Sequence, residues 1–255
     1  MKCVLLAGGL GTRLREETEH RPKPMVPVGG RPILWHIMKN YTAAGITDFV
    51  ICLGYRGDVV REYFLNYRAM NTDTTVEVDT GRVTLHGDTE ATRWSVTLAE
   101  TGALTTTGGR VFRALPYTDG ERFLCTYGDG LADVDIADVI RFHESHGQLA
   151  TMTVVRPQSR FGVLDMNDDG RVTAFHEKPQ ATDYVNAGFF VFEPGFAKYL
   201  DAECILEQEP LRHAAADGEL MAYRHDGWWQ PMDTYREFTM LNELWDSGVA
   251  PWKRW

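Results

Sequence analysis

A glycine-rich segment with basic side chains lies close to the start of the chain. Gly8, Gly9 and Gly11 come directly after an apolar run. Thr12 and Arg13 follow the last of these glycines at once. Glycines at such a position let the backbone turn tightly and bring its N–H groups against an anionic ligand. Because a guanidinium suits phosphate oxygens, the segment predicts a loop that binds phosphate groups.

Two common nucleotide-binding fingerprints do not match this loop. A GxGxxG pattern that starts at Gly9 requires a glycine at position 14, which is Leu14. A GxxxxGK[ST] pattern that starts at Gly8 requires a glycine at position 13, which is Arg13. A dinucleotide-binding fold would also place an acid at the end of the second strand, and that strand runs into Gly54 instead. The loop therefore belongs to neither of these classes.

A second basic element follows the loop, where Lys23 lies between Pro22 and Pro24. The two prolines restrict the backbone and hold the lysine side chain in one direction. Basic groups that converge near backbone amides suit a triphosphate, whose charge must be neutralised before a nucleophile approaches. The alternative is a solvated charged loop in which the glycines serve only a turn, and the loop alone does not decide between them.

Two aspartates far apart in the sequence follow strand-like runs. Asp129 lies between Gly128 and Gly130, and Asp233 follows an aromatic run. A carboxylate at the carboxyl end of a strand, beside glycines that admit a phosphate, suits Mg²⁺. The alternatives are an Asx-turn cap for the helix near Ile136 in the case of Asp129, and an N-cap of the last helix in the case of Asp233.

Composition and charge exclude several classes of function. The chain has 255 residues and a net charge of −10, and its Lys and Arg are scattered, which argues against a nucleic-acid partner. No apolar run reaches the roughly 20 residues of a membrane helix, and the first residues are expected to form a strand rather than a signal peptide. The four cysteines form no CxxC pair, which predicts a reduced, cytoplasmic protein. His143 and His146 lack a third ligand nearby and are expected at the surface.

The elements that position these residues follow from hydrophobic periodicity. Apolar runs alternate with helical spacing, which predicts one α/β domain over residues 1–255, with a Rossmann-like, mostly parallel sheet flanked by helices. Strands are expected at residues 2–7, 49–53, 123–127, 149–155 and 186–192, and helices near residues 32–45, 59–64, 136–140 and 240–245. Residues 162–175 predict a hairpin around an Asn-Asp-Asp-Gly turn. Residues 73–98 alternate apolar and polar, which predicts an inserted antiparallel β appendage that leaves the main sheet.

The segment AGGLGTRL at residues 7–14, followed by KPM at residues 23–25, resembles the signature of the sugar-1-phosphate nucleotidyltransferases. This resemblance implies the nucleotide-diphospho-sugar transferase fold, in which the loop wraps a triphosphate. It implies that Arg13 contacts the phosphates and that Lys23 stabilises charge at the phosphoryl groups. It also implies that Asp129 and Asp233 share one Mg²⁺ cofactor.

The Glu177-Lys178-Pro179 element, which alone favours a surface turn, matches the order of elements in this family. The resemblance implies that Lys178 holds the sugar phosphate and that Glu177 contacts sugar hydroxyls. The predicted catalytic residues are Arg13, Lys23 and Asp129, and the predicted metal ligands are Asp129 and Asp233. The predicted nucleotide-binding residues are Leu6, Ala7, Gly8, Gly9, Gly11, Thr12, Arg13, Lys23, Thr107, Gly109, Arg110, Gly128 and Asp129. The predicted substrate-binding residues are Tyr127, Gly162, Glu177, Lys178 and Asn186.

Within the family, segments along nearly the whole chain are similar to the cytidylyl branch. They include PILWHIM at residues 32–38, TGGR at 107–110, EQEPL at 207–211, GELMA at 218–222 and WQPMDT at 229–234. The resemblance implies CTP and a sugar 1-phosphate as substrates, with CMP passing to α-D-glucose 1-phosphate by in-line displacement to give CDP-glucose and pyrophosphate. It also implies a homo-oligomer, a hexamer, with residues 73–98 as a contact element.

Some alternatives stay open at this point. Ala187 stands where the branch pattern places a glycine, which leaves the identity of the sugar open. Another base (dTTP, UTP or GTP) with a hexose or heptose phosphate remains an alternative. A further alternative is a sugar-nucleotide sensor without turnover. The charged residues of the motifs argue against it, because all five are present: Arg13, Lys23, Asp129, Lys178 and Asp233.

Overall fold

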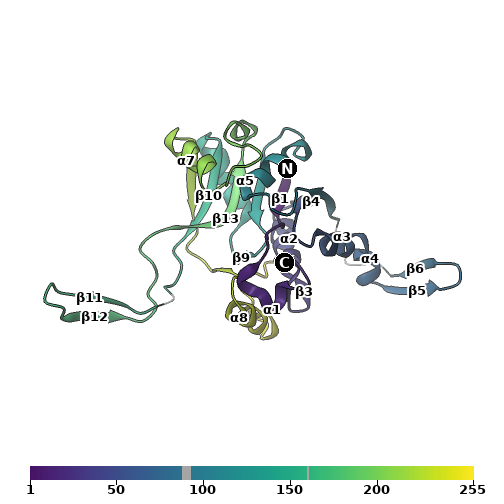
Figure 1. Cartoon of the computed structure of the whole chain (residues 1–255), viewed down its shortest axis with the longest axis horizontal. Helices are drawn as coiled ribbons and strands as arrows, with labels where there is room; N and C mark the ends of the chain where they lie inside the picture. The colour runs from purple at the N-terminus through teal and green to yellow at the C-terminus, as the bar shows by residue number, and fades with distance from the viewer. Residues whose placement is uncertain (88–92, 160) are drawn as a thin grey trace.

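The computed structural model describes residues 1–87, 93–159 and 161–255, and a seven-stranded sheet forms its centre (Figure 1). Its strands are β1 (Lys2–Leu6), β4 (Asp48–Leu53), β7 (Ser95–Glu100), β8 (Phe123–Tyr127), β10 (Ala150–Val155), β13 (Val185–Phe192) and β14 (Leu220–Arg224). They lie in the order β14-β10-β13-β8-β1-β4-β7. Only β13 is antiparallel to its neighbours, β8 and β10. The predicted mostly parallel α/β sheet is therefore confirmed.

Each central strand is buried on both faces, because its successive side chains point into two different cores. In β1, Cys3 and Leu5 belong to one core, and Val4 and Leu6 belong to the other. Helices α2 (Ile33–Ala43), α3 (Gly57–Leu65), α6 (Ile136–His146) and α8 (Tyr235–Asp246) supply side chains to the first core. Helices α5 (Thr107–Ala114) and α7 (Glu209–Ala216) supply the second. Because helices cover both faces of the sheet, the sequences of its central strands are almost entirely apolar.

None of the described helices is long and apolar enough to cross a lipid bilayer.

Two hairpins extend from opposite ends of the molecule (Figure 1). One consists of β5 (Asp73–Glu77) and β6 (Arg82–His86), and the other of β11 (Val163–Met166) and β12 (Val172–His176). The first hairpin is shorter than the expected range of residues 73–98. Strand β7 instead returns to the sheet and pairs in parallel with β4, because its apolar residues pack against the core. Residues 88–92 of the expected range lie outside the described residues.

The surface position expected for His143 is wrong. Only 1% of this residue is exposed. Its Nδ1 is 2.8 Å from the hydroxyl of Thr151, and its Nε2 is 3.2 Å from the carboxylate of Glu193. His143 lies on the buried face of α6, and its polar atoms find partners on the sheet beneath, which allows a polar ring to be buried.

An aromatic cluster at the chain's end encloses a second buried histidine. The Nε2 of His36 lies 2.8 Å from the carbonyl oxygen of Val28, and the indole Nε1–H of Trp252 donates to its Nδ1 at 3.2 Å. One ring nitrogen must therefore donate and the other accept, which only the neutral ring does. Burial lowers the pKa of His36 from 6.5 to about 4.

This histidine predicts acid sensitivity of the fold. The unfolded chain binds a proton at His36 near its ordinary pKa, whereas the folded chain binds it only near pH 4. The free energy of unfolding therefore falls as the pH drops through this window, by about 2 kcal/mol between roughly pH 7.5 and pH 5. Urea unfolding of wild type and His36→Gln at both pH values measures the difference, with the exposed His20→Gln as the control. An equal pH dependence in wild type and His36→Gln would contradict the assignment.

Candidate functional site

A cavity of about 460 Å³ opens at the carboxyl ends of β1 and β8. Most of the predicted nucleotide-binding residues line it: Leu6, Gly8, Gly9, Gly11, Thr12, Arg13, Lys23, Thr107, Arg110, Gly128 and Asp129. Four further lining residues were not among the predicted nucleotide-binding residues: Leu10, Pro24, Thr105 and Thr106. The loop after β1 therefore forms one wall of the cavity, and the start of α5 forms another.

Arg110 supports the glycine loop from behind. Only 4% of this residue is exposed. Its guanidinium donates to the carbonyl oxygens of Gly8 and Leu53, both at 2.9 Å, and to the hydroxyl of Thr101 at 2.7 Å. A Cβ on Gly8 would overlap that guanidinium, so this glycine is required for the close approach. In the structure, Arg110 thus binds mainly backbone carbonyl oxygens. Its contact with the nucleotide stays a prediction.

Two other predicted residues stand behind the cavity rather than at its surface. The backbone N–H of Ala7 donates to the carbonyl oxygen of Cys52 at 3.2 Å. Gly109 lies in the first turn of α5, where a Cβ would overlap the carbonyl oxygen of Ala202. The hydroxyl of Thr106 caps this helix by accepting from the Gly109 N–H at 3.4 Å. Both residues therefore fix the backbone of segments that line the cavity.

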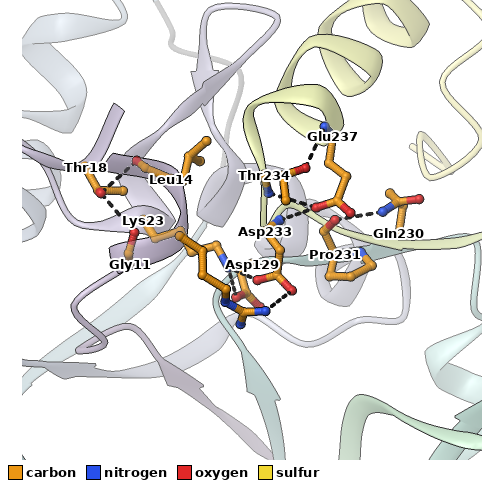
Figure 2. Close-up of polar contacts among 11 residues, drawn as sticks. Gly11, Leu14, Thr18, Lys23, Asp129, Gln230, Pro231, Asp233, Thr234 and Glu237 are labelled. Atoms are coloured by element: carbon orange, nitrogen blue, oxygen red, sulfur yellow. Dashed lines mark hydrogen bonds and ion pairs between the residues drawn. The ribbon is translucent and has the colours of Figure 1, made fainter. Parts of the chain in front are cut away.

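A short antiparallel strand pair brings the two aspartates together. Strand β9 (Gly130–Ala132) pairs with β15 (Trp229–Pro231), so that Gly130 lies opposite Pro231. The pairing continues one step further, because the N–H of Met232 donates to the carbonyl oxygen of Asp129 at 2.9 Å. Asp129 and Asp233 lie just beyond the ends of these strands, and Figure 2 shows them side by side. Residues more than a hundred positions apart thus become neighbours.

Lys23 lies between these two carboxylates (Figure 2). Its Nζ is 2.5 Å from Oδ2 of Asp129 and 2.6 Å from Oδ1 of Asp233. Burial by itself lowers the pKa of Lys23, but the charge of Asp129 and the hydrogen bonds to both aspartates outweigh it and raise the pKa. Arg13 adds a second cation, since its Nη1 is 2.8 Å from Oδ2 of Asp233. The structure therefore brings together all predicted catalytic and metal-binding residues.

The carboxylates fit a divalent cation, because one oxygen of each already approaches the same ammonium. Among the described residues no third His, Cys, Asp or Glu joins this group, so Mg²⁺ here would complete its shell with water and phosphate oxygens. The capping alternatives are wrong. Thr234 is the N-cap of α8 and forms a capping box with Glu237, while Asp135 caps α6. Neither Asp129 nor Asp233 is needed as a cap.

A second cavity, of about 1170 Å³, adjoins this cluster. Asp233, Lys178 and Arg156 are among its lining residues, together with Trp229 and Gln230. Because Asp129 lines the first cavity and Asp233 the second, the ion-paired cluster lies at their boundary. The side chain of Lys178 is about half exposed (48%) and pairs with Glu177 at 3.5 Å. Gly162 precedes β11 and Glu177 follows β12, so both lie at the base of this hairpin, and neither lines a cavity.

The remaining predicted substrate residues lie on β8 and β13. Asn186 donates its Nδ2 to the hydroxyl of Tyr127 at 3.0 Å, and Tyr127 lines the first cavity. Gly188 has a φ of 86°, and a Cβ there would overlap the ring of Tyr127. Ala187 points to the other face of the strand, where it is buried in the core with Phe189. The methyl group that replaces the expected glycine therefore faces the core.

Sequence reasoning assigned no role to Glu207, whose carboxylate accepts hydrogen bonds from Thr107 and Tyr127. Both partners line the first cavity, so Glu207 joins two of its walls. The residue lies in the EQEPL segment, which the resemblance singled out without a function. Only the folded arrangement shows which hydroxyl groups reach this carboxylate.

Comparisons with known proteins agree with this geometry. The family model described as "Nucleotidyl transferase" matches residues 2–230. The glucose-1-phosphate cytidylyltransferases of Salmonella typhimurium and Salmonella typhi are each 51% identical to the chain over the full length of both proteins. Among solved structures, UDP-glucose pyrophosphorylase superposes with a TM-score of 0.69 at 16% identity, covering 97% of this chain and 98% of that one.

The packing of the loop against Arg110 predicts different costs for two neighbouring glycines. A methyl group on Gly8 overlaps a guanidinium that several backbone carbonyl oxygens and the hydroxyl of Thr101 hold in place, whereas a methyl group on Gly9 meets no atom within 4 Å. We expect Gly8→Ala to lower the free energy of unfolding by about 1–3 kcal/mol and Gly9→Ala by less than about 0.5 kcal/mol. Urea titration of both variants measures this contrast. Equal stabilities would show that Arg110 does not hold the loop as described.

Proposed function

The chain belongs to the nucleotidyl transferase family, and we propose that it transfers CMP from CTP to glucose 1-phosphate, releasing pyrophosphate and CDP-glucose. The full-length identity to the two Salmonella cytidylyltransferases supports this choice of base and sugar. The observation that carries it is the cluster of Lys23, Asp129 and Asp233 at the boundary between two cavities. One cavity then takes the triphosphate and the other the sugar phosphate, which meet at the cluster.

The mechanism consists of positioning and charge neutralisation. The first cavity holds CTP, with the amides of the glycine loop and Arg13 on the leaving pyrophosphate. Lys178, at the second cavity, aligns the sugar phosphate, whose oxygen attacks the α-phosphorus in line with the leaving group. Lys23 offsets the charge that develops around the α-phosphate. Mg²⁺ held by Asp129 and Asp233 would supply further charge neutralisation at the phosphate oxygens. The displacement is direct and needs no covalent intermediate on the protein.

The same proposal covers assembly and location. We place the enzyme in the cytoplasm and expect it to form a homo-oligomer, a hexamer by resemblance. In support, both hairpins expose apolar side chains, among them Val76, Val83, Met166 and Phe175. An isolated hairpin is only marginally stable in water, so contacts with a second copy would stabilise these segments. The use of residues 73–98 in such contacts stays a prediction.

The base preference tests the proposed reaction. We expect pyrophosphate release with glucose 1-phosphate to be fastest for CTP among CTP, UTP, dTTP and GTP. A site that pairs with the N4 donor of cytosine leaves buried groups unpaired when UTP binds, which costs about 1–3 kcal/mol per group. A coupled pyrophosphate assay over these triphosphates and several sugar 1-phosphates measures both choices. Equal rates with UTP or dTTP would exclude the cytidylyl assignment, and no release with any pair would favour the sensor.

The shared metal site predicts that the two aspartates behave alike. Asp129→Asn and Asp233→Asn should each lower turnover at saturating substrates by about 10²-fold or more, because each removes a charge needed where phosphoryl charge develops. Asp135→Ala is the control, because Asp135 lines neither cavity and loss of this N-cap of α6 costs about 1 kcal/mol of stability and leaves turnover intact. Turnover, Mg²⁺ dependence and melting temperature are measured together. If Asp233→Asn only melts earlier, with unchanged turnover and Mg²⁺ dependence, the shared site is wrong.

A further inference from the structure

The first cavity has a wall of uncharged hydroxyl groups in addition to its glycine loop. Among the described residues that line this cavity, those with a hydroxyl group outside the loop are Thr105, Thr106, Thr107 and Tyr127. The three threonines lie at and just before the start of α5, and Tyr127 is the last residue of β8. We call these four residues the hydroxyl wall. What this wall can recognise depends on where its four protons point.

Two of the four protons are held by the backbone. The hydroxyl of Thr105 donates to the carbonyl oxygen of Thr101 at 2.5 Å. The hydroxyl of Thr106 donates to the carbonyl oxygen of Cys204 at 2.6 Å. A carbonyl oxygen has no proton, so the hydroxyl group must be the donor in both contacts. Neither proton is therefore available to a ligand in the cavity.

The other two protons are held by one carboxylate, that of Glu207. Its Oε2 accepts a hydrogen bond from the hydroxyl of Thr107 at 2.6 Å, and its Oε1 accepts one from the hydroxyl of Tyr127. The N–H of Leu206 donates to the Thr107 oxygen at 3.0 Å, and Nδ2 of Asn186 donates to the Tyr127 oxygen at 3.0 Å. Burial and then the charge of Glu207 raise the pKa of Tyr127, so its hydroxyl keeps the proton that it donates.

The hydroxyl wall therefore offers a ligand acceptors and no donor. A threonine hydroxyl has one proton and two lone pairs. In Thr107 the proton goes to Glu207 and one lone pair goes to the N–H of Leu206, which leaves one lone pair. A ligand group that donates can pair with such a wall. A buried ligand group that only accepts stays unpaired there, which weakens its binding.

We propose that Glu207 is a specificity-determining residue that keeps the hydroxyl wall ready to accept a hydrogen bond from the amino group of cytosine. Uracil has a carbonyl oxygen in place of that amino group and finds no donor on this wall. The assignment rests on the proposed function, which places CTP in this cavity. Because Arg13 and Lys23 take the phosphate groups there, the uncharged wall is left for the nucleoside. Glu207 acts through Thr107 and Tyr127 and lines neither cavity itself.

The variant Glu207→Gln tests this role directly. A glutamine amide places an N–H group against one of the two hydroxyl groups, which then accepts from the amide and can turn its own proton toward a uracil oxygen. We expect the ratio of kcat/KM for CTP to kcat/KM for UTP to fall about tenfold or more. Inhibition of the CTP reaction by UTP measures the same change in binding. Glu203→Gln, which alters an exposed carboxylate that lines neither cavity, is the control and should keep the wild-type ratio.

Substitutions of Thr107 test the wall without changing Glu207, so the test does not depend on the fold of one variant. Thr107→Val removes an acceptor and should lower kcat/KM for CTP while changing that for UTP little. Thr107→Ser keeps the hydroxyl group and should keep the wild-type preference. Melting temperatures, measured alongside, show that each variant is folded under the assay conditions.

A comparison with dCTP separates the base from the ribose, because a ribose hydroxyl can also donate to the wall. We expect Glu207→Gln to leave the ratio of kcat/KM for CTP to kcat/KM for dCTP unchanged. If this variant changes the ratio for dCTP and leaves the ratio for UTP as in wild type, the wall contacts the ribose and the proposed role in base choice is wrong.

The remaining outcomes separate this role from the proposed function. If wild type prefers CTP to UTP but folded Glu207→Gln or Thr107→Val keeps the wild-type ratio, the role of Glu207 is overturned and the proposed reaction stands. If wild type uses UTP as well as CTP, or releases no pyrophosphate from CTP, the proposed function fails, and the selection of an amino group fails with it.

Discussion

The ion pairs of Lys23 with Asp129 and Asp233 are the interaction on which the site depends. Two carboxylates that converge on one point repel each other unless a cation lies between them, and partial burial strengthens that repulsion. The pairing of β9 with β15 forces this convergence, since it places both aspartates just past the ends of the two strands. The turn Lys23–Met25 reaches the gap from the other side and holds the lysine in it. The strand pairing and the proline-flanked lysine therefore stabilise each other.

The charge balance of this cluster gives a physical reason for a cofactor cation. Arg13 and Lys23 carry two positive charges, and their partners Asp129 and Asp233 carry two negative ones. The cluster is therefore neutral, and the whole chain has a net charge of −10. Neither the cluster nor the chain as a whole attracts a negatively charged triphosphate. Under the proposed function, a divalent cation on the aspartates replaces the two basic side chains as their partner. Both side chains then become free to meet phosphate oxygens, and the site gains net positive charge.

The sequence predicted most of the sheet and the central cluster, because local patterns carry that information. Buried parallel strands are short apolar runs, and the glycine loop and the aspartates follow such runs directly. The pairing of residues 95–98 was not predictable, since alternation shows that a segment is a strand but not which strand it joins. The cap of α8 is Thr234, one residue after Asp233, which had the cap as its alternative role, and both residue types are good caps. Burial of His143 depends on Thr151 of β10 and on Glu193, the residue after β13, and the sequence of its own helix reveals neither partner.

Arg110 and Glu207 show why residue type alone does not assign a role at this site. The cavity walls are strand ends and loops, whose backbone carbonyls and hydroxyl groups lack partners within regular secondary structure. Arg110 satisfies carbonyl oxygens at the ends of β1 and β4, and Glu207 satisfies hydroxyl groups on α5 and β8. An arginine that holds carbonyl oxygens and an arginine that holds phosphate oxygens use the same donors and look identical in the sequence. The same chemistry that makes a residue suitable for an anionic substrate thus makes it suitable for the walls around that substrate.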